Sequence, residues 1–248
     1  MSATLAWIIG ASLAGGAVSL LLAAMIAYTM LAGWVPRMVS YSVGVLLGVA
    51  FLDLLPEAFE NAADPATLFS VVLGGILAFF LLEKAALWRH SHEPGERGTH
   101  GPSGLLILAG DAFHNFVDGV LIAAAFLADF RLGLATTLAV MAHEVPQEIG
   151  DFMVLLHAGY GRSRALVLNL AVSLSSVVGG ILGYFVLDYA QSLLKYAVVL
   201  AAACFIYIAV ADLIPSLHRE NRGRELGWQI GLIAVGLATI GVLGSWLH

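Results

Sequence analysis

Residues 104–127 read GLLILAGDAFHNFVDGVLIAAAFL, a long apolar run with four polar side chains near its middle: Asp111, His114, Asn115 and Asp118. At a helical rise of about 1.5 Å per residue, a helix of this length crosses the roughly 30 Å hydrocarbon core of a bilayer. An ionisable side chain at the bilayer centre costs at least about 2.5 kcal/mol on insertion scales. We therefore expect this run to be a transmembrane helix whose polar positions are functional.

The rest of the chain has the same apolar character. Its 248 residues are 60% hydrophobic and 11% charged, with a mean hydropathy of +0.92, whereas soluble domains carry about 25% charged residues. A backbone exposed to lipid must satisfy its own hydrogen bonds, so every span should be a helix. The sequence predicts an all-α integral membrane protein, one transmembrane domain over residues 1–248. Windows of about 20 apolar residues predict eight spans: 5–31, 39–60, 66–88, 104–127, 132–157, 165–187, 193–213 and 227–247.

Charge placement predicts the orientation. Of the 11 Lys and Arg residues, all but Arg131 and Lys195 flank one side of the predicted spans, and the positive-inside rule makes that side cytoplasmic. Both termini are then outside, and the hydrophilic loop 89–103, with its three histidines, is inside. Those histidines, His90, His92 and His100, are candidates for transient metal binding, or they are simply solvated loop residues. The composition shows no basic patch for nucleic acid.

A short motif recurs near the ends of the second and seventh spans. The first copy is Asp53-Leu-Leu-Pro-Glu57 and the second is Asp212-Leu-Ile-Pro-Ser216, and the two face opposite sides of the membrane. An inverted-topology repeat produces this pattern, as do two ordinary helix ends terminated by proline. We expect Asp53 and Glu57 to attract cations at the outer entrance, and Asp212 and His218 to ease exit at the inner end, unless they are ordinary polar helix ends.

The second polar run lies on the fifth span: His143-Glu144-Val-Pro-Gln147-Glu148-Ile-Gly-Asp151. Its i, i+4 spacings place these side chains on a stripe that can face the stripe on the fourth span. Imidazoles, carboxylates and amides suit Zn²⁺, with Cd²⁺, Fe²⁺, Mn²⁺ and Co²⁺ open to the same ligands. Pro146 should free a backbone carbonyl at this depth. Polar stripes can also join helices by hydrogen bonds alone, but five carboxylates with no embedded Lys or Arg would repel one another.

At these residues the chain resembles the ZIP (Zrt/Irt-like protein) family of metal transporters. The resemblance rests on the eight spans, the loop after the third, His114-Asn115-Phe-Val-Asp118-Gly on the fourth span and His143-Glu144-Val-Pro on the fifth. It is closest to the subfamily with an HExPHExGD motif. It implies a three-two-three helix arrangement with an inverted repeat. It also implies elevator-like uptake of divalent metal, zinc foremost, into the cytoplasm, with Zn²⁺ as substrate and not as a resident cofactor.

Carried over position by position, the resemblance implies a primary site of His114, Asp118, His143 and Gln147. The adjacent site would use Asn115, Asp118 and Glu144, with Gln147 as a further candidate. The remaining polar positions, Asp111, Glu148 and Asp151, are expected to support these sites or the route below them. The chain departs from the family pattern in two places. Gln147 stands where the subfamily commonly has histidine, and Ser175 and Ser176 stand where some members supply a carboxylate.

Two other classes of protein compete with this interpretation. The sequence His143-Glu144-Val-Pro-Gln147 resembles the HExxH motif of a membrane-embedded zinc metallohydrolase, yet glutamine replaces the second histidine and proline interrupts the turn. A carrier of organic solutes would not need His and carboxylate pairs. We expect a transporter and not an enzyme, multi-pass in a bacterial inner membrane because no large extracellular domain precedes the first span. Its expected partners are divalent metal ions and the lipid bilayer, and a homodimer is the oligomer to test.

Overall fold

The computed structural model describes residues 3–28, 34–60, 62–91, 102–219 and 226–246. These residues are almost entirely helical, and no β-strand occurs among them. The α-helices are α1 (Ala3–Tyr28), α2 (Val35–Gly48), α3 (Leu55–Phe59), α4 (Pro65–Ser91), α5 (Pro102–Ala128), α6 (Phe130–His157), α7 (Arg162–Ser173), α8 (Ser175–Tyr189), α9 (Leu194–Tyr207), α10 (Ile214–Arg219) and α11 (Leu226–Trp246). Two π-helices, η2 (Val49–Leu54) and η4 (Ile208–Leu213), and one 3-10 turn, η3 (Gln191–Leu193), complete the described chain.

Each predicted span coincides with a helical segment. The second is α2-η2-α3, the sixth is α7-α8 and the seventh runs from η3 through α10; the other five are single helices. In the described part of the chain, 7 segments are long and apolar enough to cross a membrane. The exception is α6, which carries Arg131 and three carboxylates of the second polar run. The all-α membrane class is confirmed, and the helix that fails the apolar criterion is the one that carries this run.

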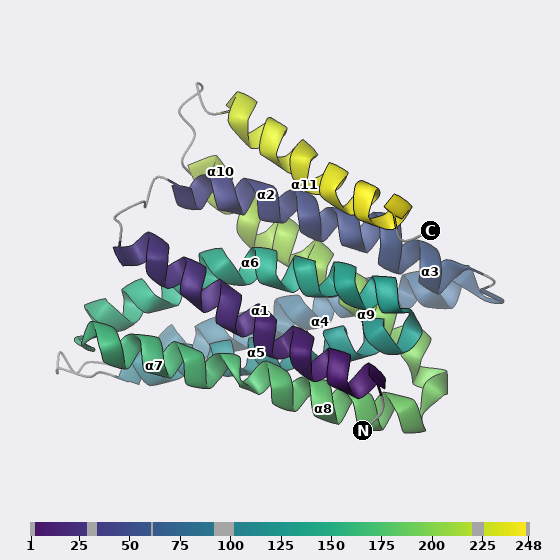
Figure 1. Cartoon of the computed structure of the whole chain (residues 1–248), viewed down its shortest axis with the longest axis horizontal. Coiled ribbons are helices and arrows are strands. Elements are labelled where there is room, and N and C mark those ends of the chain that lie inside the picture. The colour runs from purple at the N-terminus through teal and green to yellow at the C-terminus, as the bar shows by residue number, and fades with distance from the viewer. Residues whose placement is uncertain (1–2, 29–33, 61, 92–101, 220–225, 247–248) are drawn as a thin grey trace.

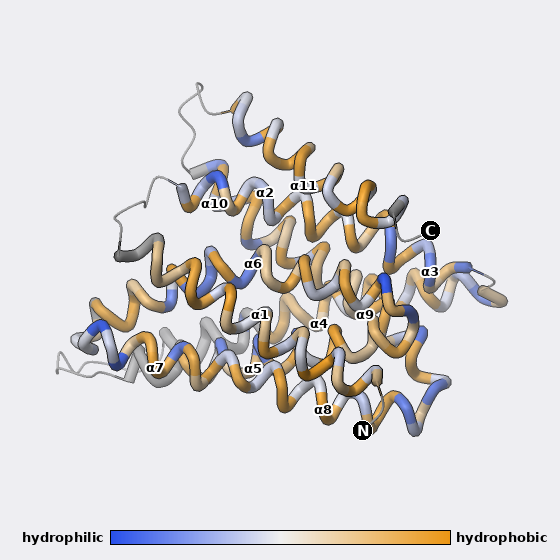
Figure 2. Tube along the Cα trace, in the orientation of Figure 1, coloured by the Kyte–Doolittle hydropathy of each residue, from blue (hydrophilic) through white to orange (hydrophobic). Residues whose placement is uncertain are grey.

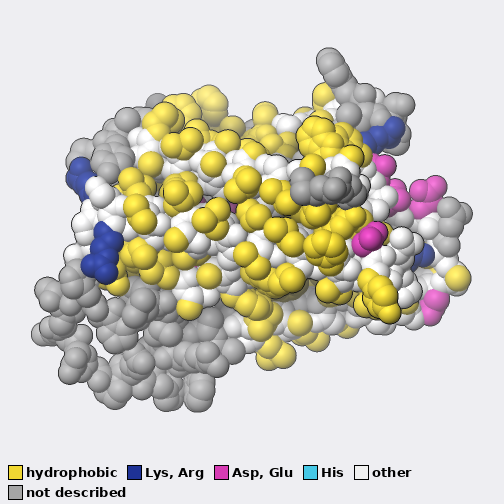
Figure 3. Space-filling model, turned by 60° about the horizontal axis from the view of Figure 1, so that its bottom comes forward, with side chains coloured by type: hydrophobic (Ala, Val, Ile, Leu, Met, Phe, Trp, Pro, Cys, Tyr) yellow, Lys and Arg dark blue, Asp and Glu magenta, His cyan; other side chains and the backbone are white. Residues whose placement is uncertain are grey.

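The helices lie roughly side by side, and the two ends of the bundle differ in charge. The start of α1 and the end of α11 lie at the same end (Figure 1). We call this the acidic end, because Glu57, Glu60 and Asp129 lie there, and the opposite end, with Arg37 and Arg162, the basic end. Between the two ends, hydrophobic side chains cover most of the described face drawn in Figure 3, and the Cα trace is coloured mostly hydrophobic over the same region in Figure 2. Exposed Leu73 and Phe185 illustrate how large apolar residues face outward there, as expected in lipid.

The helices pack in pairs that an inverted repeat would produce. Such a repeat exchanges the first three spans with the last three, and the fourth span with the fifth. The α1–α6 contact then corresponds to α8–α5, the α2–α11 contact to α9–α4, and the α2–α6 contact to α9–α5; all six pairs are in contact. The two central helices, α5 and α6, pack directly on each other. They are therefore enclosed by matching partners.

The motif of residues 53–57 and 212–216, which we call the acidic-proline motif, has the same local structure in both copies. In each copy the first two residues end a π-helix, η2 or η4, and the proline follows two residues later. In the first the Leu55 N–H donates to the Ala50 carbonyl, and in the second the Ile214 N–H donates to the Ala209 carbonyl, both five residues back. Proline cannot donate to the preceding turn, and π-bulges often accompany such local unwinding. The five-residue sequence match thus extends to a shared departure from α-helical geometry.

Carboxylates fix two helix starts near the acidic end. Asp129 accepts a hydrogen bond of 2.8 Å from the Arg131 N–H at the start of α6. Asp64 does the same before α4, accepting from the hydroxyl and the N–H of Thr67. These two bonds, the hydroxyl bond first, hold the pKa of Asp64 below its usual value. Side-chain acceptors at an N-cap satisfy donors that the helix cannot.

Glycines allow α5 and α8 to cross at backbone contact. A Cβ atom built on Gly119 would lie 1.9 Å from the Ser176 carbonyl oxygen, and one on Gly179 would lie 2.0 Å from the Phe116 carbonyl oxygen. Real Cβ atoms do not approach backbone so closely, so any side chain there would push the helices apart. Gly119 directly follows Asp118. The crossing therefore sets the depth of the polar run on α5.

We predict that Gly119→Ala lowers the apparent Tm of the detergent-solubilised protein by on the order of 5 °C, since overpacking costs roughly 1–3 kcal/mol. Gly110→Ala, on the same helix, is the matched control because its Cβ would meet nothing within 4 Å. Alanine is the better helix former, so the control should melt at the same temperature or higher. Thermal unfolding followed by size-exclusion chromatography measures both, and equal Tm values would contradict the prediction.

Candidate metal centre

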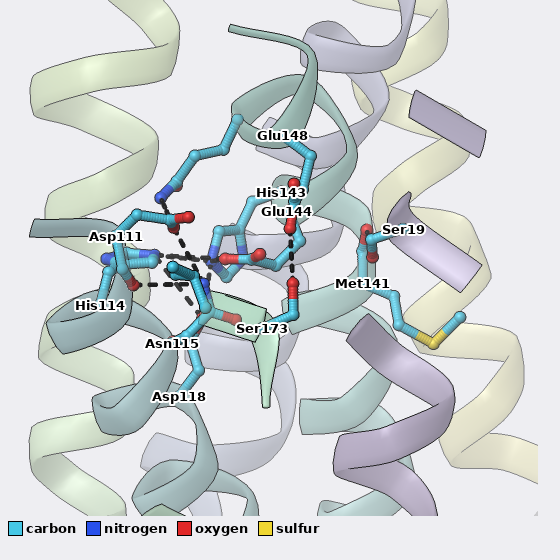
Figure 4. A network of polar contacts seen from close by, with 12 residues as sticks. Ser19, Asp111, His114, Asn115, Asp118, Met141, His143, Glu144, Glu148 and Ser173 are labelled. Carbon is cyan, nitrogen blue, oxygen red and sulfur yellow. Dashed lines mark hydrogen bonds and ion pairs between the residues drawn. The ribbon is translucent and has the colours of Figure 1, made fainter. Parts of the chain in front are cut away.

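Four side chains from α5 and α6 converge in the interior of the bundle (Figure 4). His114 and Asp118 come from α5, and His143 and Glu144 come from α6. We call them the four-ligand cluster; one ligand atom from each lies within 4.8 Å of the others. The two imidazole Nε2 atoms are 3.2 Å apart. Asp118 Oδ2 lies 3.6 Å from His114 Nε2 and 3.3 Å from His143 Nε2.

These separations match the edges of a small tetrahedron. Glu144 Oε1 completes it, 3.7 Å from His114 Nε2 and 3.9 Å from His143 Nε2. Zn²⁺ binds nitrogen and oxygen ligands at about 2.0–2.2 Å, which gives a regular tetrahedron with edges of roughly 3.3–3.6 Å. The five measured separations of the cluster bracket this range. Over these five edges, the two nitrogen and two oxygen donors are therefore spaced as ligands of one tetrahedral ion, and the sixth edge is within 4.8 Å.

A backbone contact orients His143 toward the centre of the cluster. Its Nδ1 lies 2.9 Å from the Ala139 carbonyl oxygen, one helical turn back. A carbonyl only accepts, so Nδ1 carries the proton and the Nε2 lone pair of the neutral ring faces the cluster. Metal-binding histidines commonly donate their second nitrogen in this way. The His114 ring stands edge-on to it, with ring planes at 89°.

Burial makes the carboxylates of the cluster costly without a cation. Asp118 is 0% exposed and Glu144 is 2% exposed. Among the described residues, no hydrogen-bond donor meets either oxygen of Asp118 or of Glu144. Buried carboxylates are normally paired, hydrogen-bonded or bound to a metal. A divalent ion would balance both charges and occupy the space on which all four ligand atoms converge.

A second polar group lies one turn closer to the basic end, around Asp111. Its Oδ1 accepts a hydrogen bond of 2.9 Å from Asn115 Nδ2 and one of 3.3 Å from Gln147 Nε2. Asp111 and Asn115 are 5% and 3% exposed. Gln147, which the resemblance implied in the primary site, thus contacts Asp111 through its amide nitrogen. Glu144 stands in the four-ligand cluster, where the resemblance gave it to the adjacent site.

Glu148 faces α7 and lies outside the four-ligand cluster. Its Oε1 accepts a 2.7 Å hydrogen bond from the Ser173 hydroxyl, and its backbone carbonyl accepts from Asn169 Nδ2 at 3.4 Å. Asp151 follows one turn later and is half-buried. The sequence did not point to Ser173 or Asn169, because small polar residues in an apolar helix carry no signal of their partner.

Pro146 frees a carbonyl in α6, as predicted, and a neighbouring helix then satisfies it. The missing N–H of Pro146 leaves the Ala142 carbonyl without its usual donor four residues on. The Ser42 hydroxyl of α2 donates to that carbonyl, and also lies 2.8 Å from the Met38 carbonyl of its own helix. The proline could be read from the sequence, but its partner could not. This carbonyl is joined to Ser42.

A cavity of about 290 Å³ reaches the cluster from the side of η4. His143, Pro146 and Gln147 line it on α6, and Asp212 and Ser216 line it on the segment that ends in α10. His218, the other residue expected near the exit, is exposed on α10 and does not line this cavity. Asp212 and His143 of the cluster therefore border the same cavity.

A larger cavity, of about 570 Å³, lies at the acidic end. Asp53, Glu57, Glu60 and Asp129 line it together with Arg131, and none of the four cluster residues does. The two copies of the acidic-proline motif therefore border cavities at different ends of the bundle. Of these two cavities, the one beside η4 includes a cluster residue in its lining.

The remaining predicted positions have other surroundings. Ser175 donates to the Ala112 carbonyl of α5 at 2.7 Å, and Ser176 is buried at the α5–α8 crossing. Neither contributes a carboxylate. Of the loop histidines, His92 and His100 lie outside the described residues, as does the side chain of His90.

Comparison with known proteins gives one consistent family. Residues 89–244 match the family model described as ZIP Zinc transporter. Zinc transporter ZIP13 of Pongo abelii is 32% identical over 220 residues, which cover 82% of this chain and 65% of that protein. Zinc transporter ZIP4 of Homo sapiens is 41% identical over 143 residues, 57% of this chain and 21% of that protein. The chain thus spans just under two thirds of the first relative and about a fifth of the second.

We predict that Asp118→Ala weakens equilibrium Cd²⁺ or Zn²⁺ binding by at least about 100-fold, because it removes an anionic ligand and leaves Glu144 facing the imidazoles alone. Gln147→Ala should weaken it by no more than about tenfold, since a neutral amide outside the four-ligand cluster is lost. Equilibrium dialysis of the purified variants measures both. An equal loss in the two variants would show that Asp118 matters no more to binding than Gln147, which would contradict the assignment of the four-ligand cluster.

Proposed function

The chain belongs to the ZIP zinc transporter family, and we propose that it carries divalent metal ions, Zn²⁺ first among them, across a membrane through the four-ligand cluster. The observation that carries this proposal is the set of four converging donor atoms between α5 and α6, three of them from buried residues and one from the half-buried His114. Two imidazoles with two carboxylates suit Zn²⁺, and the same set accepts Cd²⁺, Co²⁺, Fe²⁺ and Mn²⁺. No cysteine is among the four, which fits an ion that must leave again.

The ion is proposed to leave at the basic end. The positive-inside rule makes that end cytoplasmic, so transport runs inward and both termini are outside. The cavity beside η4 supports this direction, because His143 and Gln147 line it together with Asp212. Asp212 would receive the ion next, since a carboxylate there draws a cation out of the cluster. The structure then corresponds to an inward-facing state.

Alternating access by an elevator-like movement is the proposed mechanism. Support comes from the matched helix pairs and from the two π-helical copies of the acidic-proline motif. In transporters built from inverted repeats, alternating access is largely a movement of one repeat or bundle against the other around a fixed site. The cavity at the acidic end, which Asp53 and Glu57 line, would collect cations from outside, because an acidic cleft raises the local cation concentration. In this state it does not reach the cluster.

The proposed location is a bacterial inner membrane, with the 89–103 loop in the cytoplasm and a homodimer as the oligomer to test. A membrane-embedded zinc metallohydrolase is not favoured. Pro146 interrupts the HExxH-like turn, and Gln147, in place of its second histidine, contacts Asp111 through its amide nitrogen. The relatives are named as transporters. The chain is therefore not proposed to be an enzyme.

The proposal predicts metal flux through the purified protein. Proteoliposomes that contain it should accumulate Zn²⁺ faster than empty liposomes, measured with an enclosed fluorescent chelator. His143→Ala is the negative control, because it removes a donor that is 1% exposed and central to the cluster. A folded chain that moves neither Zn²⁺, Cd²⁺, Fe²⁺ nor Mn²⁺ would end the transport proposal, and hydrolysis of a lipid or peptide would revive the enzyme.

Replacement of Gln147, which lines the cavity beside η4, should change metal selectivity. Gln147→His adds an imidazole beside His143, and nitrogen donors favour Zn²⁺ over Mn²⁺. We expect the ratio of the Mn²⁺ to the Zn²⁺ transport KM to rise by about tenfold. Gln147→Asn, which keeps an amide, is the matched control. An unchanged ratio in Gln147→His would mean that this position does not meet the ion.

A further inference from the structure

Asp111 is a buried carboxylate to which the proposed function gives no direct part. It lies three residues before His114 on α5 and is 5% exposed. It is not in the four-ligand cluster. Its Oδ1 instead accepts hydrogen bonds from two amide side chains, Asn115 on its own helix at 2.9 Å and Gln147 on α6 at 3.3 Å. One oxygen atom therefore holds two carboxamides from two helices; Asp111 and Asn115 are labelled in Figure 4.

The chemistry of these groups fixes which way the amides point. The Oδ1 atom of Asp111 accepts both hydrogen bonds, whereas a carboxamide has an NH₂ donor at one end and an oxygen acceptor at the other. Both NH₂ groups must therefore face Asp111. The amide oxygens, the only atoms of these side chains that can bind a cation, are turned away from it. Without such an anchor, an amide could equally present its NH₂ group to the ion and repel it.

The two amides belong to residues that lie close to the cluster along their helices. Asn115 adjoins His114 and precedes Asp118 by three residues, so it shares a helix face with the α5 ligands. Gln147 lies one turn after His143 on α6 and lines the same cavity as His143. The two amides thus flank the cluster on the side from which the ion is proposed to leave.

We propose that Asp111 is a positioning residue that holds the carboxamides of Asn115 and Gln147 by their NH₂ groups, so that both oxygens face a divalent cation beside the four-ligand cluster. This proposal rests on the proposed function and concerns the hydrogen bonds that orient ligands at the same metal site. It also explains how glutamine serves at position 147, since an amide needs a fixed orientation to act as a ligand. Asp111 supplies that orientation across the α5–α6 contact.

The proposal is tested by removing the acceptor that both amides share. In Asp111→Leu no acceptor remains for the two NH₂ groups, so the carboxamides can turn over and present NH₂ to the ion. We expect the Cd²⁺ dissociation constant and the transport KM to rise about tenfold, with little change in maximal rate. Asp111→Asn is the matched control, because its amide oxygen can take the place of Oδ1 and accept from both NH₂ groups. Its affinity should stay within about threefold of wild type.

A second comparison separates positioning from direct binding by Asp111. When Asn115→Ala and Gln147→Ala are both present, Asp111 has no amide left to hold, so adding Asp111→Leu should cost less than about threefold. If Asp111 were itself a ligand, or only joined the helices, the tenfold loss would persist in that background. That result, or a tenfold loss in Asp111→Asn alone, overturns the proposal.

The measurements keep this proposal apart from the transport proposal. Cd²⁺ binding is measured on the full chain in detergent, and flux is measured separately in proteoliposomes. Binding without flux in the wild type would end the transport proposal and leave the Asp111 comparisons readable. If Asp111→Leu does not fold, Asp111→Ala, which also lacks an acceptor, is compared with Asp111→Asn; we expect about tenfold weaker binding in Asp111→Ala, and equal binding in the two would overturn the proposal.

Discussion

Asp118 and Glu144 are two carboxylates that the interior of the helix bundle has to accommodate. Both are almost fully buried, and no described donor meets their oxygens. In a medium of low dielectric constant, such charges need a counter-charge at short range. The imidazole lone pair of His143, oriented by the Ala139 carbonyl, does not supply one. A divalent cation does, so the cluster is understandable as a site that is stable when it is filled.

Contacts with the surrounding helices hold these groups together. Gly119 and Gly179 bring α8 into backbone contact with α5, directly beside Asp118. On α6, Pro146 breaks the hydrogen-bond ladder next to His143, and Ser42 of α2 satisfies the carbonyl that this leaves. Each departure from a regular, apolar helix is compensated by one neighbouring helix. The polar site is thus held by contacts that lipid could not replace.

Much of this could be predicted from the sequence, and the limit has a physical cause. Hydrophobic windows located every helical segment, and helical periodicity placed His114 and Asp118 on one face and His143 with Gln147 on another. Periodicity does not give the rotation of α6 relative to α5, so Glu144 and Gln147 were equally able to meet the histidines. The structure turns Glu144 to the cluster and Gln147 to Asp111. Contacts such as Ser42 with Ala142 depend on the same rotation.

The two copies of the acidic-proline motif have equal local structure and unequal surroundings. Asp212 borders a cavity that His143 also lines, whereas Asp53 borders one that no cluster residue lines. Local sequence cannot cause this difference, because both copies form a π-helix before a proline. It must come from where α5 and α6 sit between matched partners, α2 with α6 and α9 with α5. A displacement of the α5–α6 pair would exchange the two environments without altering either copy, which is the physical content of alternating access in a repeated fold.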